Sequence, residues 1–266
     1  MRLVSLCPSN TELVAYLGAT DLLVGVDNYS DWPSSVKTLP QLGPDLSINV
    51  EKVASLKPDL CLASLSVPGM EKNIAALEKH KLPYVIFNPS TLSDISNDLL
   101  TLGKLIGREE AALTLTDKIS QLIKTFGPAF SSQRPTLYWE WWAKPIFTPG
   151  AGNWLTEMSH LAGGRNCFED DPRASVKTTW EDVVKRDPDH ICLVWVGVDP
   201  VKVKKEFVLK RPEVETLKAF KTNSIHILPE PFFCRPSPRL YTGLQMIHHL
   251  LTKKPYTHLG DPLLDE

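Results

Sequence analysis

Histidine is the side chain that most often carries acid–base catalysis or binds a metal, and this chain contains seven. They include no H-x3-H pair and no Cys/His grouping with metal-ligand spacing, and the adjacent His248 and His249 point in different directions on an expected helix. Glu157 and His160 stand three residues apart on another expected helix, but the amino terminus of that helix, and not their end, should face the ligand edge of the sheet. We therefore predict no catalytic residue and no metal site.

Other catalytic motifs are missing too, since no G-x-S-x-G, G-x4-G-K-[ST] or G-x-G-x-x-G segment occurs. The five cysteines lack paired spacing and are expected to be small core residues. The chain has 266 residues, 42% hydrophobic composition, a net charge of -2 and no run of Lys or Arg longer than two. These values predict a globular protein that binds no nucleic acid and whose ligand is small.

Aromatic side chains stand where a recognition site is most readily built. In open α/β sheets, ligands bind beyond the carboxyl ends of the strands, so the residues after each expected strand are candidates. They are Ser9, Asn10, Tyr29, Trp32 and residues 64–69 in the first half, and Trp141, Trp142, Trp195, Phe232, Phe233 and Arg235 in the second. Exposed aromatic clusters are typical of recognition surfaces, although some of these rings are expected to fill the core of their own lobe instead.

Strands and helices alternate along the first half, which predicts a parallel sheet covered on both faces. Ser9 or Asn10 is expected to cap the first helix, and Gly18 to end it in the left-handed conformation. The expected strands are 3–7, 22–26, 60–63 and 84–87. The first expected helix ends at 17, and the others span 50–56, 70–79 and 92–106.

The same alternation returns in the second half. The expected strands are 136–139, 191–194 and 225–228, with helices at 154–161 and 180–185, through 206 and at 238–253, and a turn at 148–152. Residues 51–59 and 181–189 both follow the pattern E-x-V-x4-P-D before an apolar run, which indicates a short helix, a Pro-Asp turn and a buried strand. We interpret this as two copies of one unit.

A single long helix is expected to join the copies, because apolar residues recur every three or four positions over 108–126. Its roughly 19 residues would run about 28 Å. The predicted architecture is two Rossmann-like α/β lobes with parallel sheets, 1–107 and 128–266, joined by a backbone helix at 108–127. Since the hydrogen bonds of a helix resist bending, ligand binding is expected to move the lobes only slightly, through Gly107 and Gly127-Pro128.

Several segments together resemble a known family. They are SLCPSNTELVAYLG, VGVDNYSDWP, INVEKVASLKPDLCLAS, IFTPGAGNWLTEMSHLAGG and FFCRPSPR. In this order, over nearly the whole chain, they are similar to the solute-binding proteins of vitamin B12 and iron-siderophore ABC uptake, most closely the cobalamin-binding ones. The resemblance implies two lobes on a helical backbone, with cobalamin or a related corrinoid held between them.

Carried over position by position, the resemblance gives each lobe its ligand contacts. The family's cleft aromatics fall on Tyr29 or Trp32, on Trp141 or Trp142, and on Phe232 or Phe233. Arg235 is the expected basic contact, ahead of Arg239, because it lies nearer the strand end. Two positions depart from the family, since Leu65 matches a tryptophan and Pro231, beside Glu230, matches an acid.

The resemblance also implies docking on a permease, which works with ATPase subunits, through one acid on each lobe. Glu71 matches the first of these positions. In the second lobe, residues 199–206 are rich in lysine, so only Asp199 or Glu206 could serve, and we take Asp199 as the candidate. A lysine facing a permease arginine would be unfavourable, so we expect ligand binding more firmly than docking.

The ligand is left open between three classes. A large, nearly neutral corrin is held mainly by aromatic and aliphatic contacts, whereas a tri-anionic ferric siderophore calls for several basic groups. Haem usually takes an iron ligand, which Tyr29 or Tyr241 could supply. A tetrapyrrole chelatase is the enzyme alternative, and it would need a convergent His/Glu pair. We expect a cobalamin-binding protein that is not an enzyme and has no resident cofactor.

The cellular location follows from the resemblance, which implies the periplasm or cell surface. No apolar stretch reaches the roughly 18 residues that a membrane span needs. The chain starts directly on its first expected strand, without a signal peptide, so a cytoplasmic place is expected if Met1 is the native start.

Overall fold

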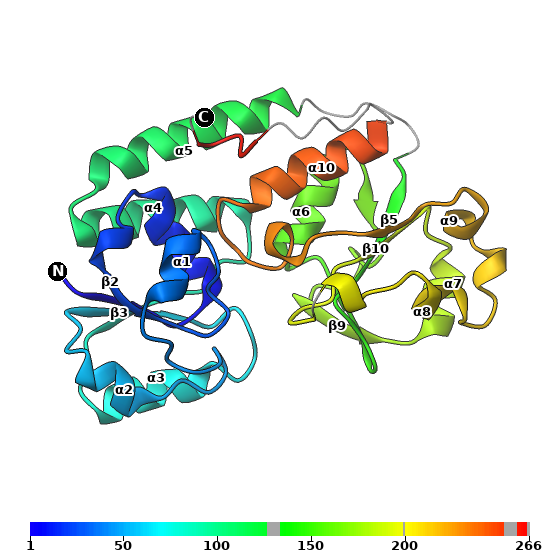
Figure 1. The fold of residues 1–266 in the computed structure, drawn as a ribbon. Helices are drawn as coiled ribbons and strands as arrows, with labels where there is room; N and C mark the ends of the chain where they lie inside the picture. Colours follow the sequence, from blue (N-terminus) through cyan, green and yellow to red (C-terminus); the bar gives the residue numbers. More distant parts are fainter. Residues whose placement is uncertain (127–133, 199, 253–259, 265–266) are drawn as a thin grey trace. The chain divides into compact units, whose positions relative to one another are not determined.

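The computed structural model describes residues 1–126, 134–198, 200–252 and 260–264 (Figure 1). The chain divides into two compact units: unit 1 is Met1–Ser120 with Pro236–Pro238, and unit 2 is Gln121–Arg235 with Arg239–Glu266. This division falls inside the long helix expected at 108–126. The lobe boundaries expected at the ends of that helix stay a prediction.

Unit 1 is built on a parallel sheet with the strand order β2-β1-β3-β4, as the alternating pattern predicted. Helices α1 and α4 lie over one face of this sheet, and α2 and α3 lie over the other (Figure 1). Val4 and Cys61 of the sheet pack in one core cluster with Val53 and Leu77 of the helices. The elements are β1 Leu3–Ser5, α1 Pro8–Tyr16, β2 Leu23–Val26, α2 Val50–Ser55, β3 Leu60–Ser64, α3 Glu71–Lys79, β4 Tyr84–Phe87 and α4 Leu92–Ile106.

Unit 2 repeats this topology, because its parallel sheet has the order β8-β5-β10-β11, which matches β2-β1-β3-β4 strand for strand. Tyr138, Ile191 and Ile225 from neighbouring strands lie in its core cluster. The elements are β5 Thr136–Glu140, β6 Trp142–Ala143, β7 Ile146–Pro149, α6 Trp154–Leu161, β8 Arg165–Asn166, β9 Ser175–Thr178, α7 Trp180–Arg186, β10 His190–Leu193, α8 Glu206–Leu209, α9 Lys218–Lys221, β11 Ile225–Ile227 and α10 Leu240–Thr252.

The E-x-V-x4-P-D repeat takes the same structure in both units. Lys57 and Asp187, the residues before the two prolines, both adopt a positive φ, of 48° and 44°. The aspartates that follow, Asp59 and Asp189, each accept a hydrogen bond from a backbone N–H at the start of the neighbouring strand, at 2.6 and 2.8 Å. Each aspartate thus ties the turn before one strand to the beginning of another. The two copies predicted from the sequence are confirmed.

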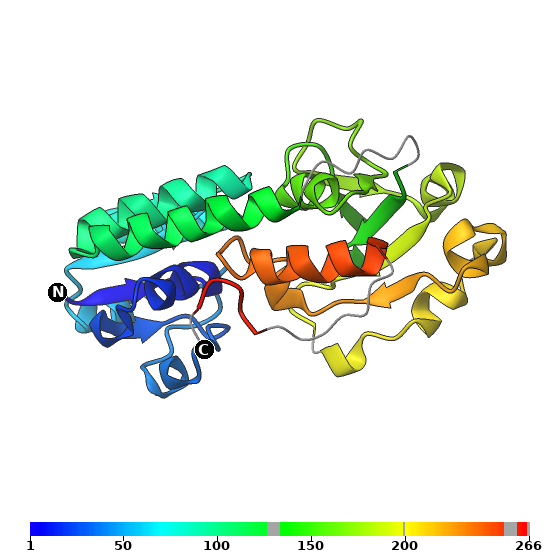
Figure 2. The same cartoon turned by 90° about the horizontal axis from the view of Figure 1, so that it is seen from above.

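The long helix is α5 Glu109–Thr125, one residue shorter at each end than expected. Gly107 takes the left-handed conformation at the end of α4, with φ 69°, and allows the chain to turn back (Figure 2). The first part of α5 packs closely on α4 at Gly103, where an added Cβ would lie 2.6 Å from the Cβ of Ala112. Only a glycine therefore allows this helix spacing.

A second sheet in unit 2 was not predicted. Residues 148–152 were expected to be a turn, but 148 and 149 belong to β7, which pairs antiparallel with β6 and with β9. The partner strand β9 lies far along the chain, so no local sequence pattern predicted its pairing with β7.

Two local expectations were also wrong. Ser9 and Asn10 do not cap the first helix, because Cys7 is the N-cap and Pro8, whose fixed φ suits a helix start, opens α1. The helix expected to run through Glu206 instead begins there as α8.

Candidate functional site

A buried chain of hydroxyl groups holds the loop after β2 in unit 1. Thr11 Oγ1 donates to Ser5 Oγ at 2.8 Å and lies 2.7 Å from Ser30 Oγ, which in turn donates to the carboxylate of Asp27 at 2.5 Å. Asp27 also accepts a hydrogen bond from the backbone N–H of Tyr29 at 2.7 Å. Because these polar groups are buried and satisfy one another, the loop that carries Tyr29 is held in one conformation.

The predicted residues of unit 1 fall into two groups. Tyr29 is 49% exposed, and Trp32 on the same loop is half-buried, with its ring 5.1 Å from that of Tyr16. Leu65 is half-buried beyond β3. Ser9 and Asn10, in contrast, are buried in the first turn of α1, where Asn10 Nδ2 donates to the carbonyl of Ala63 on β3 at 3.0 Å. Ser9 and Asn10 therefore support the strand ends and do not present a surface.

Glu140 organises the strand ends of unit 2. Its fully buried carboxylate accepts two hydrogen bonds from Arg211, at 2.6 and 2.8 Å, one from the Tyr138 hydroxyl at 2.7 Å and one from Trp195 Nε1 at 3.0 Å. Burial and the neighbouring carboxylate raise the pKa of Tyr138 well above its usual value, so the phenol stays a donor. The Arg211 guanidinium also lies 4.8 Å from the ring centre of Trp180. This network sets the orientation of the Trp195 indole.

The three tryptophans predicted in unit 2 lie on connected segments, with Trp142 in the short strand β6. The backbone N–H of Val196 donates to the carbonyl of Trp141 at 3.1 Å, which joins the loop after β10 to the end of β5. Trp142 is 44% exposed, and its Nε1 donates to the carbonyl of Lys144 at 3.0 Å. Trp141 is half-buried, and its indole N–H has no hydrogen-bond partner among the described residues. These segments thus expose Trp142 and part of Trp141 and Trp195.

The closing aromatics divide into a core residue and a surface residue. Phe233 is fully buried against Trp139, with ring centres 5.5 Å apart, and its carbonyl accepts a hydrogen bond from Trp154 Nε1 at 2.8 Å. Phe232 is half-buried beneath the Arg239 guanidinium, which lies 4.7 Å from its ring centre. In this structure Phe232, and not Phe233, has ring surface to offer a ligand.

Arg235, the predicted basic contact, is paired. Its Nε lies 3.2 Å from a carboxylate oxygen of Glu230, and both side chains are largely buried. Cys234 donates from its thiol to the carbonyl of Val194 at 3.3 Å, which holds this loop against the end of β10. The site of unit 2 therefore contains a neutralised arginine beside aromatic rings.

Of the two predicted docking acids, only Glu71 lies within the described residues. Glu71 is exposed at the first position of α3, and its carboxylate accepts a hydrogen bond from the backbone N–H of Gly69 at 2.8 Å. Asp199 lies outside the described residues. Glu206, the alternative acid, is exposed at the start of α8.

In the described part of the chain, no group of three or more His, Cys, Asp or Glu side chains could hold a metal ion. His160 Nε2 lies 2.6 Å from a carboxylate oxygen of Glu169, so this ring nitrogen already has a partner other than Glu157. Burial raises the pKa of Cys7 and of Cys61 to about 12, which disfavours the nucleophilic thiolate.

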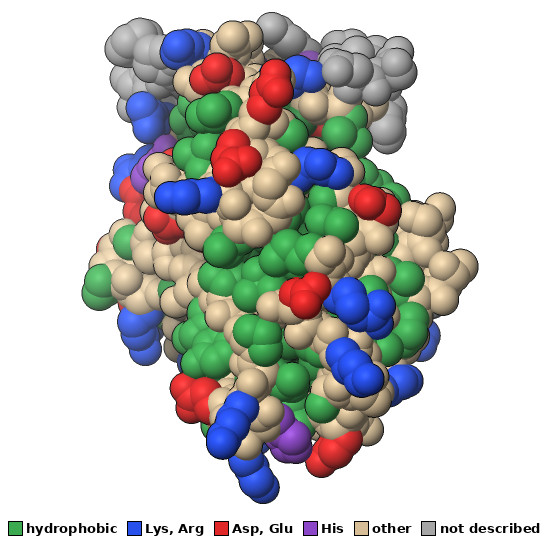
Figure 3. Space-filling model, turned by 90° about the vertical axis from the view of Figure 1, so that its left-hand side faces the viewer, with side chains coloured by type: hydrophobic (Ala, Val, Ile, Leu, Met, Phe, Trp, Pro, Cys, Tyr) green, Lys and Arg blue, Asp and Glu red, His purple; other side chains and the backbone are tan. Residues whose placement is uncertain are grey.

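No helix among the described residues combines the length and apolarity of a membrane span. Figure 3 shows one face on which hydrophobic side chains and both charge signs are interspersed.

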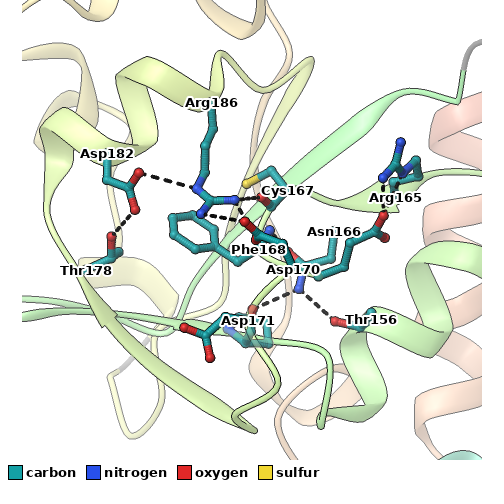
Figure 4. Close-up of polar contacts among 12 residues, drawn as sticks. Thr156, Arg165, Asn166, Cys167, Phe168, Asp170, Asp171, Thr178, Asp182 and Arg186 are labelled. Atoms are coloured by element: carbon teal, nitrogen blue, oxygen red, sulfur yellow. Dashed lines mark hydrogen bonds and ion pairs between the residues drawn. The ribbon is translucent and has the colours of Figure 1, made fainter.

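A polar cluster supports the turn before α6 in unit 2. Asn166 Nδ2 donates to the carbonyl of Pro149 at 2.8 Å and to Thr156 Oγ1 at 2.7 Å (Figure 4). Arg186 pairs with Asp170 at 2.7 Å and with Asp182 at 3.4 Å, and its guanidinium lies 4.1 Å from the ring centre of Phe168. These contacts fix the loop between β8 and β9 against α7.

Sequence reasoning missed the residues that hold the site in place. Glu140 could have been suspected, because it closes an apolar strand directly before two tryptophans. Arg211 carried no signal, since it stands 71 residues from Glu140 in a polar, proline-containing segment. Thr11 and Ser30 resemble ordinary helix-start and loop residues.

The family comparison matches most of the chain. Residues 3–231 match the family described as periplasmic binding protein. A curated relative, the vitamin B12-binding protein of Yersinia pestis (strain Pestoides F), is 27% identical over 259 residues, which cover 96% of this chain and 87% of the relative.

Solved structures share the fold. The periplasmic vitamin B12 binding protein of Vibrio cholerae superposes with a TM-score of 0.78 at 24% identity, covering 95% of this chain and 97% of the other. A periplasmic heme binding protein from Pseudomonas aeruginosa superposes with a TM-score of 0.83 at 21% identity, covering 98% and 96%. At these identities the structures establish the two-lobed α/β fold and leave the ligand open.

Proposed function

Because the chain belongs to the periplasmic binding protein family, we propose that it is the substrate-binding component of an ABC importer and that its ligand is cobalamin or a related corrinoid. The relative that is named a vitamin B12-binding protein and matches over almost the whole chain supports this ligand class.

The observation that carries the proposal is the pairing of Arg235 with Glu230. The pair balances the charge of Arg235, while the same unit presents the rings of Trp142 and Phe232, the latter with the Arg239 guanidinium 4.7 Å from its centre. In unit 1 the strand-end surface offers Tyr29 and Trp32. A large ligand with little net charge is bound well by such apolar and aromatic surfaces.

A ferric siderophore fits these residues less well. Its trianion would need several basic groups, and the main candidate, Arg235, already has its charge balanced by Glu230. Binding such a ligand would require the arginine to leave a largely buried carboxylate behind, which is costly.

Haem is the second candidate, and one observation favours it. Tyr29 is 49% exposed and could place its phenol oxygen on the iron, whereas Tyr241 is fully buried and could not. Haem would therefore need the Tyr29 hydroxyl as an iron ligand, whereas a corrinoid would contact only the tyrosine ring.

The test is a set of parallel titrations with cyanocobalamin, haemin and a ferric trihydroxamate, followed by visible difference spectra and tryptophan fluorescence. We expect cyanocobalamin to bind tightest, and Tyr29→Phe to retain that binding while Tyr29→Ala weakens it. Tightest binding of haemin, with its absorption spectrum changed by Tyr29→Phe, would establish the haem alternative. Tightest binding of the ferric trihydroxamate would overturn both.

Transport partners and location belong to the same proposal. We expect permease and ATPase subunits as partners, with Glu71 contacting the permease from unit 1, and an extracytoplasmic place of action. Charge reversal of Glu71 to Lys should reduce uptake by the assembled transporter without changing ligand affinity, because this exposed side chain starts α3 and the aromatic candidates Tyr29 and Trp32 lie on a different loop of the unit. An equal loss of affinity and uptake would contradict the docking role.

A further inference from the structure

Residues 201–210 of unit 2, here called the basic segment, combine exposed apolar side chains with a concentration of lysines. Val201 is 82% exposed and Phe207 is 49% exposed, and Leu209 is exposed as well. Lys202, Lys204, Lys205 and Lys210 accompany them, and Glu206 is the one acid in the segment. Large exposed apolar side chains that gather on a surface often mark an interaction site, and three occur within these ten residues.

The basic segment is anchored, so its outward side chains are presented by a folded structure. It comprises the end of the 3-10 helix Pro200–Lys202 and the short helix α8, labelled at the right of Figure 1. Val203 and Val208 are buried in the core cluster of unit 2. The ring of Phe207 lies 5.4 Å from that of Trp195, which joins the segment to the loop after β10.

The four lysines of the basic segment outnumber its one acid, Glu206. None of the four lysines has an ion pair within the described residues, whereas other basic groups of unit 2, such as Lys218 with Asp187 and Arg186 with Asp170, are paired. The segment therefore carries an excess of positive charge in a protein whose net charge is -2.

Two classes of partner could use such a surface, and the composition separates them. The cores of protein–protein interfaces are depleted in lysine, because an ammonium group is costly to desolvate. A lipid surface makes the opposite demand, since lysines remain in the headgroup region while aliphatic and aromatic side chains enter the boundary below them. Anionic headgroups add an attraction equivalent to roughly fivefold in partitioning for each lysine at low salt.

We propose that the basic segment docks unit 2 on an anionic lipid surface, with its lysines on the headgroups and Val201 and Phe207 at the edge of the acyl region. The contact lies beside Glu206, the alternative docking acid of unit 2, and its Phe207 also packs on Trp195 of the strand-end loops. It would hold the protein near a membrane without any spanning helix.

The test is co-sedimentation of the ligand-free protein with vesicles of phosphatidylcholine alone and of phosphatidylcholine mixed with phosphatidylglycerol, at low and at physiological salt. We expect binding only to the mixed vesicles, weakening as salt rises. The double variant Lys202→Glu/Lys204→Glu should lose about 25-fold or more of this binding, because two favourable charges become repulsive. Val201→Ser should weaken it without changing charge.

The matched control is Lys72→Glu/Lys79→Glu, which makes the same charge change at two exposed positions of α3 in unit 1. This control should bind the mixed vesicles as the parent does. The proposal is overturned if the parent protein does not bind the mixed vesicles or if both double variants lose this binding equally. It is also overturned if Val201→Ser leaves the binding to mixed vesicles unchanged. Retention on immobilised polyglutamate without vesicle binding would assign the surface to an acidic protein partner and overturn the lipid proposal too.

Discussion

Glu140 is the position at which the structure makes its most quantitative prediction. Its buried carboxylate balances Arg211 and also orients Tyr138 and Trp195. Glu140→Gln removes the charge and keeps one carbonyl oxygen, which can accept from Tyr138 or from Trp195 but not from both, because the two donate to different carboxylate oxygens. The substitution therefore leaves the Arg211 guanidinium without its counter-charge while changing little in volume.

The expected cost follows from the burial of the pair. Breaking a buried ion pair by removing one partner costs about 3–5 kcal/mol, because the remaining charge stays desolvated. Arg211 retains some exposure, so we expect about 3 kcal/mol for Glu140→Gln. Arg211→Met should cost more, since Glu140 is fully buried. The double variant should cost less than the two single changes added together, by about 2 kcal/mol, because neither charge is then left behind.

The assay is urea unfolding followed by tryptophan fluorescence. Six of the seven tryptophans lie in unit 2 and only Trp32 lies in unit 1, so the signal reports mainly the unit that contains the pair. The thermodynamic cycle needs the parent, both single variants and the double variant under the same conditions. A cost below about 1 kcal/mol for Glu140→Gln, or strict additivity of the two substitutions, would refute the reasoning.

Three further predictions follow. Trp32→Ala and Trp142→Ala should each weaken corrinoid binding by about 2 kcal/mol or more in a fluorescence titration while circular dichroism stays unchanged, and parent-like affinity in both would contradict the aromatic surface. Desolvation and nearby Asp94 raise the pKa of Asp98 from 3.8 to about 7. The folded state then binds this proton more tightly than the unfolded state, so the stability of the folded protein falls as pH rises between these values. Asp98→Asn should therefore raise the Tm near neutral to alkaline pH and leave it unchanged near pH 4. Gly103→Val should destabilise unit 1 by about 1–3 kcal/mol in urea, because its side chain would overlap α5, and an unchanged midpoint would contradict the close helix packing.

Much of the fold was predictable because its signals are local. The helix at 92–106 and the strand at 84–87 were predicted to the residue. Apolar patterning acts within a few positions, and the structure adds a threonine cap at the start of the helix and a left-handed glycine at its end. The E-x-V-x4-P-D repeat predicted the duplicated unit for the same reason, because a helix, a Pro-Asp turn and a strand are written in adjacent residues.

The tertiary structure alone decided which of these residues face solvent. Phe232 and Phe233 are neighbours of one type, yet one is half-buried beneath Arg239 and the other is fully buried against Trp139. Ser9 and Asn10 were predicted at the ligand surface but are buried within α1. Composition and spacing do not contain this information, because burial depends on what a distant segment places over a residue.

Long-range pairing decided the rest. The sequence by itself determined the helices, most strands and the aromatic character of the strand-end loops, since these arise from backbone preferences and apolar patterning within short segments. Only the fold joined Glu140 to Arg211, Ser237 to Glu12 and β7 to β9. These partners stand far apart along the chain. A buried charge or an unpaired strand is stabilised by its distant partner and not by its neighbours in sequence, so short sequence patterns do not predict the pairing.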